Sequence, residues 1–472
     1  MKIKLFKLFF FVLQYILLFK LDKSVAENSS IKHLPIARDF VVALPSITGE
    51  QEYKIVLEVW DIPNNRQEPR KTTENLQKAI DWAHGNGYGK VILPPGHYLL
   101  GIEAAAKYPW GWTKGKNRED NFSMHGLTLP SNMEFILDSS AVLEMVSNDK
   151  VMYCIICIED VTDVIIRGGT LKGDRQTHTY TPHHNRTTHE WGHGILISNK
   201  VHRILVTNME IKDVTGDGVY VRTEKRYNGS DITIKNNDIH NARRQGVSIV
   251  GGLRVKIENN EIHHIKGTSP QFGVDIEGPW TITKDVAIHR NNFHDNRGGD
   301  VVNYDGKNVF ITENRMIEGD SYSYVDGPLV TRHQTYQVIA HNNITMKTES
   351  VNGLLGYIQY SRGGPKGHNH TTYVHDNYCQ GCGMYMYKSA DADIRRNKFI
   401  GYFLGLVHFQ NAVVVDNHVE VPKKRDVCNW SYRFKNTTGK AMGNTYATNS
   451  EPDNVEPYQI PLNEQQPWTR PC

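Results

Sequence analysis

Beyond its N-terminus the sequence contains no long apolar run, and it carries no large excess of charge of either sign. Crossing a bilayer takes about 20 consecutive apolar residues, so no later segment is expected to span a membrane. The formal net charge is only +3, which excludes a strong electrostatic attraction to nucleic acid or to a membrane surface. Neither is therefore an expected partner.

Cysteine is scarce as well. The six cysteines are Cys154, Cys157, Cys379, Cys382, Cys428 and Cys472. An even number in an exported chain permits disulfides, but their pairing does not follow from the sequence. "CIIC" and "CQGC" have a spacing that zinc sites use, yet a regular strand through "CIIC" puts its two cysteines on opposite faces. We therefore predict no metal held by these residues, and a Cys428–Cys472 pair could close the C-terminal tail.

The first 26 residues have the pattern of a secretory signal peptide. A basic start is followed by an apolar run from Leu8 to Phe19 and by the small-residue site "SVA". The run is short for a membrane span, so we expect cleavage after Ala26 and a secreted, extracellular protein. The alternative is an uncleaved membrane anchor.

Asparagine recurs through the second half of the chain in a short pattern: an aliphatic residue, two variable residues, Asn, one variable residue and an apolar residue. It reads "IKNNDI" at 234–239, "IENNEI" at 257–262 and "IHRNNF" at 288–293. The shared asparagines are Asn237, Asn260, Asn291, Asn314, Asn342, Asn377, Asn397 and Asn417. Their spacing varies between 20 and 35 residues, which indicates one fixed structural turn with loops of free length.

Each repeat contains short β-branched runs, which favour strands. A unit of about 20 residues cannot bury its own apolar face, so the units must stack on one another. Coils of three short strands, stacked at the ~4.8 Å strand spacing, form a continuous apolar interior. Asn tolerates the left-handed turn conformation, and stacked asparagines form hydrogen-bonded ladders, so we assign these residues a structural role.

The start of such a stack needs a cover, because terminal repeats expose apolar core. The segment "TTENLQKAIDWAHGNG" at 72–87 predicts a helix that provides it, capped by Thr72 or Thr73. Its apolar residues at helical spacing are Leu76, Ala79, Ile80 and Ala83. A strand, a turn and a second strand follow in "KVILPPGHYLL".

The segment "NLQKAIDWAHGNGYGKVILPPGHYLL" resembles the opening of right-handed parallel β-helix proteins of the pectate-lyase superfamily, and the asparagine repeats resemble their parallel β-helix repeats. The resemblance covers residues 72–420 and implies an all-β right-handed parallel β-helix with an N-terminal capping helix. The remaining divisions are a signal peptide (1–26), an N-terminal extension (27–71) and a C-terminal tail (421–472) that packs on or caps the helix.

Aligning the strand that follows each repeat locates one candidate working face. In "GVDIE" at 273–277, Val274 and Ile276 point inward, whereas Asp275 and Glu277 point outward to solvent. The neighbouring strands are "GVYVR" (218–222), "GVSIV" (246–250) and "DVVNY" (300–304), and they place Val219, Val221, Val247 and Ile249 inside. The catalytic candidates are Asp275, Glu277, Asp217 and Asp300, and the substrate-binding candidates are Arg243, Arg244, Arg222, Tyr220, Trp191 and His193.

The last two of these candidates end the histidine-rich segment "THTYTPHHNRTTHEWGHG" at 177–194, which we interpret as a long loop over the same face. Carboxylates and arginines on one face predict a polysaccharide as the partner. In a lyase, Arg neutralises a uronate carboxylate while a base removes the adjacent proton. In a glycoside hydrolase, two carboxylates flank the scissile bond. The carboxylates also make bound Ca²⁺ possible.

Family motifs leave the reaction open. Polygalacturonase-like hydrolases carry an "NTD…DD" arrangement that this sequence lacks, and "GHG" at 192–194 lies in the wrong order for them. The stretch "RRQGVSIV" resembles the "DRHG" stretch of alginate epimerases, but Arg and Gln replace Asp and His, which disfavours their mechanism. The alternative class is a non-catalytic β-helix adhesin or glycan-binding spike.

Overall fold

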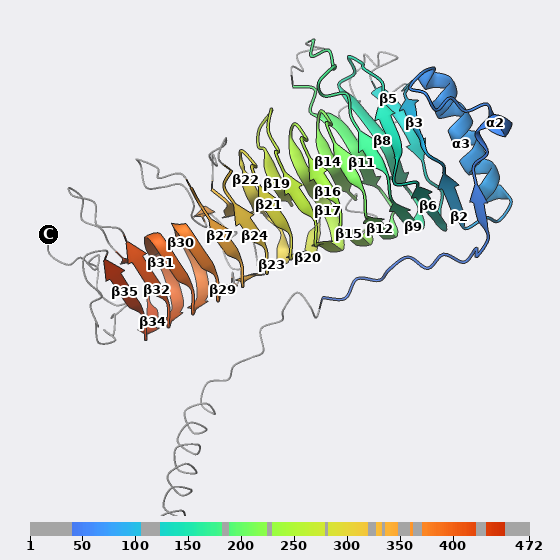
Figure 1. Cartoon of the computed structure of the whole chain (residues 1–472). Coiled ribbons are helices and arrows are strands. Elements are labelled where there is room, and N and C mark those ends of the chain that lie inside the picture. The colour runs from blue at the N-terminus through green and yellow to red at the C-terminus, as the bar shows by residue number, and fades with distance from the viewer. Residues whose placement is uncertain are drawn as a thin grey trace, which may run out of the picture. The chain divides into compact units, whose positions relative to one another are not determined.

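The computed structural model describes residues 40–104, 123–181, 188–223, 229–278, 282–319, 327–332, 336–347, 359–361, 371–421 and 431–448 (Figure 1). The chain divides into two units, Met1–Phe40 and Val41–Cys472, and the fold is that of the second unit. The expected signal peptide lies outside the described residues, as do Cys428 and Cys472. Among the described helices, none is long and apolar enough to cross a bilayer.

Strands stack in parallel along three series, so the chain winds as a parallel β-helix. Stack 1 consists of β5 (Ser123–Thr128), β8 (Met152–Glu159), β11 (Trp191–Ser198), β14 (Asp217–Arg222), β17 (Gln245–Glu258), β19 (Phe272–Glu277), β22 (Gly299–Tyr304), β25 (Leu329–Arg332), β28 (Gln359–Ser361), β30 (Tyr378–Arg395), β31 (Lys398–Val415) and β33 (Tyr432–Lys435). Stack 2 consists of β1 (Glu52–Lys54), β2 (Lys90–Leu93), β6 (Met133–Leu137), β9 (Thr162–Arg167), β12 (His202–Thr207), β15 (Ser230–Lys235), β17, β20 (Thr283–His289), β23 (Lys307–Thr312), β26 (Tyr336–Ala340), β29 (Thr371–His375), β30, β31 and β34 (Gly439–Met442). Stack 3 consists of β3 (Gly96–Leu100), β7 (Ala141–Met145), β10 (Thr170–Lys172), β13 (Glu210–Lys212), β16 (Asp238–His240), β18 (Glu261–His263), β21 (Asn292–His294), β24 (Arg315–Ile317), β27 (Asn343–Thr345), β30, β31, β32 (His418–Val421) and β35 (Thr445–Thr448).

The predicted fold class is confirmed. The strand β4 (Ile102–Ala104) pairs antiparallel with β5 beside the start of the helix. At the other end, β35 pairs in parallel with β32, so the stacking continues to Thr448, past residue 420 where the sequence placed its end.

Two helices precede the coils, α2 (Leu57–Trp60) and α3 (Pro69–Gly85), and α3 packs against β3 and β5 (Figure 1). The four apolar residues predicted for its inner face are all fully buried. The predicted start is wrong, because the helix begins at Pro69 and a proline is favoured at the first helical position. Thr72 and Thr73 lie within the first turns and donate their hydroxyls to the carbonyls of Glu68 and Pro69.

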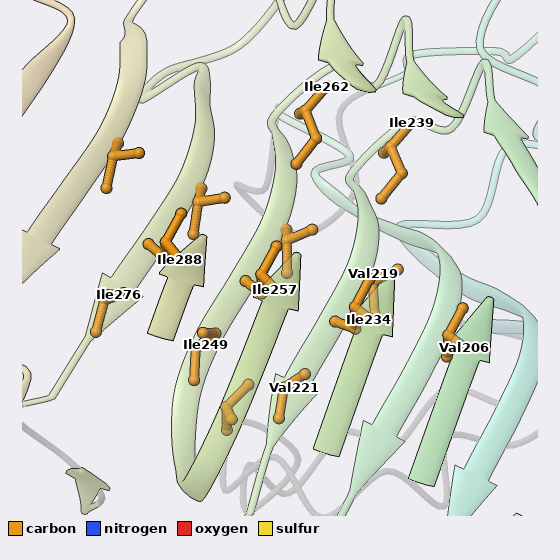
Figure 2. Close-up of a cluster of buried hydrophobic side chains, with 14 of the residues drawn as sticks. Val206, Val219, Val221, Ile234, Ile239, Ile249, Ile257, Ile262, Ile276 and Ile288 are labelled. Carbon is orange, nitrogen blue, oxygen red and sulfur yellow. The ribbon is translucent and has the colours of Figure 1, made fainter. Parts of the chain in front are cut away.

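The interior is a continuous column of aliphatic side chains (Figure 2). Val219, Val221, Val247 and Ile249 are fully buried, as predicted, and so are Val274 and Ile276 of the next coil. Equivalent residues lie directly opposite one another, for example Val247 and Val274, so each coil packs on the same kind of residue in the next. Alternating β-branched residues therefore specify the core.

The recurring asparagines form a buried hydrogen-bonded ladder, which confirms their structural role. It runs through Asn237, Asn260, Asn291, Asn314, Asn342, Asn377, Asn397, Asn417 and Asn444. In the third member, Asn291, Nδ2 donates to Asn314 Oδ1 and to the Ile257 carbonyl, and Oδ1 accepts from the Nδ2 and the backbone N–H of Asn260. Every polar atom of this side chain is thus paired inside the protein.

The ladder asparagines do not themselves adopt the left-handed conformation that the sequence suggested. The residue before each one does, for example Asn259 at φ 53°, Arg290 at 54° and Glu313 at 56°. Only Asn and Gly reach this region at little cost, yet charged residues occupy it in several coils. The hydrogen bonds of the ladder therefore hold the turn in place. The turn does not depend on the conformational preference of the residue that precedes each ladder asparagine.

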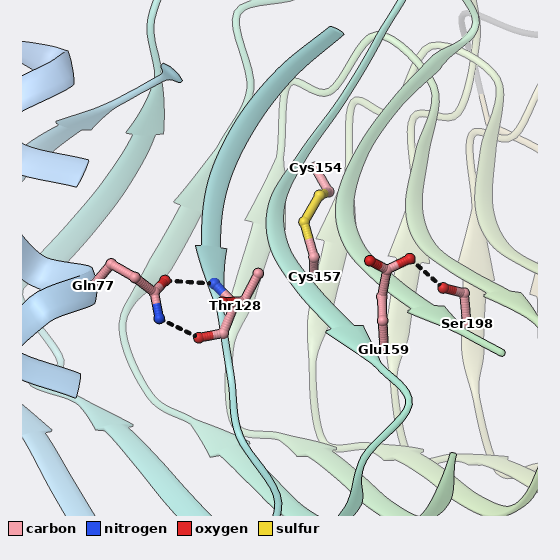
Figure 3. Close-up of a disulfide and its surroundings, with 6 residues drawn as sticks. All are labelled: Gln77, Thr128, Cys154, Cys157, Glu159 and Ser198. Carbon is pink, nitrogen blue, oxygen red and sulfur yellow. Dashed lines mark hydrogen bonds between the residues drawn. A yellow bond between two sulfur atoms is a disulfide. The ribbon is translucent and has the colours of Figure 1, made fainter. Parts of the chain in front are cut away.

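Disulfides join Cys154 to Cys157 and Cys379 to Cys382. The expectation that "CIIC" puts its cysteines on opposite faces is wrong. Ile155 and Ile156 both pack into the core, so the alternation of β8 slips by one residue and both cysteines face outward (Figure 3). A run of two consecutive inward residues is invisible to a strict two-residue period.

Removing one carboxamide from the ladder should cost much of its local stability. Asn291→Ala removes the side-chain partner of the Ile257 carbonyl, of the Asn260 backbone N–H and of one Asn260 Nδ2 hydrogen, whereas Asn314 Oδ1 still accepts from the backbone N–H of residue 291. Each buried unpaired group costs about 1–3 kcal/mol, so we expect a loss of at least about 3 kcal/mol in the free energy of unfolding, measured by urea denaturation. The matched control is Asn292→Ala, whose side chain makes only exposed contacts and should change stability by less than about 0.5 kcal/mol. Equal losses in the free energy of unfolding in both variants would show that the hydrogen bonds of the ladder contribute no special stability.

Candidate functional site

Three neighbouring strands of stack 1 bring the candidate residues together on their outer side. In β14, β17 and β19, Tyr220 lies opposite Ser248, and Ser248 lies opposite Asp275. Three residues earlier in the same two strands, Asp217 lies opposite Gln245. Side chains from successive coils therefore form rows across the strands, at the strand spacing of ~4.8 Å.

In these strands two consecutive residues face inward, so the residues before and after that pair, which are three positions apart, both face outward. In β14 both Gly218 and Val219 face the interior, so Asp217 and Tyr220 both face outward. A Cβ on Gly218 would lie 2.5 Å from Ile239 Cγ2, so only glycine fits that inward position. Gly246 occupies the equivalent position in β17, which turns Gln245 outward as well.

Arg244 links the acids of two coils. Its Nη1 donates to Asp217 Oδ2 at 2.9 Å, and its Nη2 donates to Glu277 Oε1 at 3.3 Å. Its guanidinium carbon lies 5.8 Å from the centre of the Trp191 ring, within cation–π distance. The Asp217 side chain is fully buried, whereas that of Glu277 is 29% exposed, so Glu277 forms part of the rim of the site.

Gln245 holds the remaining carboxylate. Its Nε2 donates to Asp275 Oδ2 at 2.5 Å, and its Oε1 accepts from the backbone N–H of Phe272. Burial first, and the neighbouring Glu277 carboxylate second, raise the pKa of Asp275 well above its ordinary value. Asp275 therefore favours its protonated form beside Glu277.

His193 stacks on Tyr220, with ring centres 4.5 Å apart and an interplanar angle of 23°. Burial, assisted by the positive charge of Arg244, lowers the pKa of His193 to about 3, so the ring is neutral. The backbone N–H of Asp217 donates to His193 Nδ1 at 3.3 Å. A neutral ring that accepts at Nδ1 carries its proton on Nε2, so His193 Nε2 is a donor.

Three buried polar atoms here make no hydrogen bond of good geometry with the residues that the structure describes: Asp217 Oδ1, His193 Nε2 and Ser248 Oγ, although the Ser248 hydroxyl is close enough to the Asp217 carboxyl to lower its pKa. Buried polar atoms are paired in nearly all cases, because an unpaired one costs roughly 1–3 kcal/mol. Burial raises the pKa of Asp217 to about 6, against the opposing charge of Arg244, so this carboxyl can also act as a donor. The gathering of these unpaired atoms makes this the candidate ligand site.

Seven of the ten sequence candidates thus converge: Asp217, Asp275, Glu277, Arg244, Tyr220, Trp191 and His193. The outward direction of Asp275 is confirmed, but the expectation that it faces solvent is wrong, since it is 3% exposed and covered by its neighbours. Arg222 ends β14 on the same outer side as Tyr220 and is half-buried.

Two candidates lie elsewhere. Asp300 takes the register position of Gly273, on the core side of its strand, and accepts a hydrogen bond from Asn296 Nδ2 at 3.0 Å. It is fully buried and faces away from the other acids. Arg243 donates through Nη1 to the Thr188 carbonyl, and its guanidinium carbon lies 4.5 Å from the centre of the Tyr180 ring. Arg243 therefore anchors the preceding histidine-rich segment.

His178 and His189 of that segment form a buried chain with Asp174, which precedes it. His178 Nδ1 lies 2.8 Å from Asp174 Oδ2, and His178 Nε2 lies 2.8 Å from His189 Nδ1. These contacts fix the segment internally, whereas Trp191 already belongs to β11. The described part of the segment is therefore a packed structure beside the site, and His183 and His184 lie outside the described residues.

Sequence reasoning missed Gln245 as a site residue. The signal was present in the repeated Gly–Val pair of "DGV", "QGV" and "FGV", since the residue before each such glycine lies in one row. A strict two-residue period assigns that position to the inner face, so the slip in alternation concealed it.

A family model described as "Right handed beta helix region" matches residues 137–266 and 226–440, and the chain belongs to this family. The uncharacterized protein YclG of Bacillus subtilis is 29% identical over 286 residues, covering 57% of this chain and 47% of YclG. The chain therefore spans about half the length of this curated relative.

Solved structures with a similar fold include the A-module of the mannuronan C-5 epimerase AlgE6 of Azotobacter vinelandii, with a TM-score of 0.48, 14% identity, and coverage of 84% of this chain and 99% of the module. The Streptococcus pneumoniae surface adhesin PfbA has a TM-score of 0.47 and 13% identity, covering 84% of this chain and 91% of PfbA.

The raised pKa of Asp217 predicts the direction in which stability changes with pH. The folded state holds this proton more tightly than the unfolded chain, whose pKa is near 3.8. The resulting stabilisation is complete below pH 3.8 and is lost as the pH rises through about 6. We expect Asp217→Asn to flatten the fall in the free energy of unfolding between pH 4 and 8, by up to about 1.4 kcal/mol per pH unit.

The matched control for that series is Asp163→Asn. Pairing with Arg203 lowers the pKa of Asp163 to about 2, so its stabilisation is present above pH 3.8 and is lost only as the pH falls through about 2. This variant should leave the slope between pH 4 and 8 unchanged. A slope in Asp217→Asn equal to that of the unmodified protein would show that Asp217 does not titrate in this range.

Proposed function

We propose that this protein is a secreted enzyme that modifies an acidic polysaccharide by acid–base chemistry at the site formed by β11, β14, β17 and β19. The observation that carries the proposal is the group of unpaired buried atoms on Asp217, His193 and Ser248. Single unpaired atoms also occur on residues outside the site, such as Thr207 and His375, so the argument for a ligand is that three of them gather at one place. The fold sets these atoms on rigid strands, which holds their geometry.

The unpaired atoms suit the carboxylate of a uronate sugar. His193 Nε2 and Ser248 Oγ are donors, and Asp217 becomes a third donor when it is protonated. Arg244 adds a positive charge at the same place. Hydrogen bonds to a charged acceptor contribute about 1.5–3 kcal/mol each, so two or three of them are enough to select an acidic sugar.

Glu277 is the group that we assign to proton transfer. Among the three acids of the site, Glu277 alone has a side chain with substantial exposure, and Asp275 beside it favours the protonated form. Hydrolysis with two flanking carboxylates requires a second open carboxylate, which Asp217 and Asp275 do not supply because they are buried. One open base beside a neutralised carboxylate instead fits proton abstraction next to that carboxylate, as in β-elimination.

The first experiment incubates the purified protein with uronate polymers and neutral glucans, while absorbance of unsaturated ends and release of reducing ends are recorded in parallel. Elimination raises both signals with an acidic polymer. Reducing ends without unsaturated ends would replace elimination by hydrolysis. Binding of a glycan with neither signal, and no change in the sugar by NMR, would overturn the enzymatic proposal in favour of a glycan-binding surface protein.

With an active polymer, Glu277→Gln should lower kcat by about 100-fold or more, because Gln keeps the size of Glu but cannot accept the proton. The matched control is Glu258→Gln, a partly buried acid of β17 in stack 2 that pairs with Lys256. The control should keep the unmodified rate. Turnover by Glu277→Gln at that same rate would rule out Glu277 as the proton-transfer group.

Ser248→Ala tests recognition separately from proton transfer. Its hydroxyl is buried and makes no hydrogen bond of good geometry with the described residues, so the substitution should leave the thermal midpoint unchanged or slightly raised. Binding of an acidic oligosaccharide, measured by calorimetry, should weaken by about tenfold, and binding of a neutral one should not change. Unchanged affinity for the acidic sugar would contradict the assignment of Ser248 to its carboxylate.

A further inference from the structure

A second cluster of ionisable side chains lies on the outer side of stack 3, away from the site on stack 1. The strands β16, β18 and β21 read "DIH", "EIH" and "NFH", and their register places His240 opposite His263 and His263 opposite His294. The rings stack with centres 4.8 and 4.5 Å apart and interplanar angles of 7° and 12°. Three successive coils thus present a column of imidazoles.

A fourth histidine turns back onto this column. His264 has a positive φ of 57°, which directs its ring across the ends of the strands. Its ring lies edge-on to His263 and His294, with centres 4.8 and 5.7 Å away. The Nδ1 atoms of His263 and His264 lie 2.6 Å apart, so at least one of them carries no proton and accepts from the other, and a metal ion would take the place of the shared proton.

Carboxylates hold the far sides of the rings. Asp238 lies 3.0 Å from His263 Nε2, and Glu261 lies 3.1 Å from His294 Nε2. A carboxylate on one ring nitrogen fixes the tautomer and presents the other nitrogen to a metal ion.

We propose that His263, His264 and His294 form a binding site for a divalent transition-metal ion of the zinc, cobalt or nickel type. One ring nitrogen from each of the three lies within 4.8 Å of the others, a separation that small side-chain adjustments close around one ion. Imidazole nitrogens favour these ions, whereas Ca²⁺ and Mg²⁺ favour oxygen ligands. Asp295 Oδ2 lies 2.7 Å from His294 Nδ1, the nitrogen that the Glu261 contact leaves to the ion, so metal binding would replace this hydrogen bond and leave the Asp295 carboxylate beside the ion as a fourth ligand.

The proposed metal site does not depend on the proposed enzymatic function, because it lies on a different strand stack. Its ligands come from two adjacent coils, through β18 with the following turn and through β21. A bound ion would therefore join these coils outside the core and stabilise the folded state by mass action. The sequence carries the signal as an acid or amide, an apolar residue and a histidine at the same place in three repeats.

The test uses the full chain without an oligohistidine tag, freed of metal by chelator and dialysis. Titration with Co²⁺ should produce visible d–d absorption that saturates at one ion per chain, and Zn²⁺ should displace it. The thermal midpoint should rise with added Zn²⁺. Circular dichroism of each metal-free variant shows that it has folded before metal is added.

In His263→Ala and His264→Asn the affinity for Co²⁺ should fall by at least about tenfold, and Glu261→Gln should weaken it by a similar factor through the orientation of His294. Asn replaces His264 because it tolerates the positive φ. The control is His202→Ala in stack 2, whose ring contacts Ser230, and it should bind as the unmodified protein does. Unchanged Co²⁺ binding in folded His263→Ala and His264→Asn, or no saturable binding by the unmodified protein, would overturn the proposal.

Discussion

The pairing of every polar atom in the asparagine ladder is the constraint on which the other features of the molecule depend. Each carboxamide accepts from the coil before it and donates to the coil after it, so a coil displaced by one residue would leave several buried groups unpaired. That penalty fixes the register of every coil on the next, while the aliphatic core supplies most of the driving force for stacking. Loops of different lengths are tolerated because they lie outside the ladder and leave its turns unchanged.

A fixed register turns a linear repeat into two-dimensional rows of side chains. The row that joins Tyr220, Ser248 and Asp275 exists because their strands cannot shift relative to one another, and the histidine column on stack 3 exists for the same reason. The contrast between ladder and site is informative. The ladder pairs all of its polar atoms, whereas Asp217, His193 and Ser248 bring three of the eight unpaired buried side-chain atoms of the described residues together in one place.

Most of the fold could be predicted from the sequence because its physics is local and repeated. Alternating Val and Ile residues correctly predicted that Val247 and Ile276 point inward, and the recurring asparagines correctly predicted a stack of repeated coils. The candidate site was reached by the same alternation, which correctly turned Asp275 outward. The same rule also missed a site residue. Two consecutive inward residues, such as Gly218 and Val219, break the strict two-residue period, which therefore placed Gln245 on the inner face. The burial of Asp275 depends on neighbours from other coils, and Asp300 lies on the core side because it takes the register position that Gly273 holds in the coil before it.

A crystal structure of this protein with a bound uronate oligosaccharide tests the central claim most directly. We expect one sugar carboxylate within hydrogen-bonding distance of His193 Nε2 and Ser248 Oγ, with Glu277 Oε atoms near the carbon that bears that carboxylate. An acidic sugar bound elsewhere, with the atoms of His193, Ser248 and Asp217 still unpaired, would contradict the account.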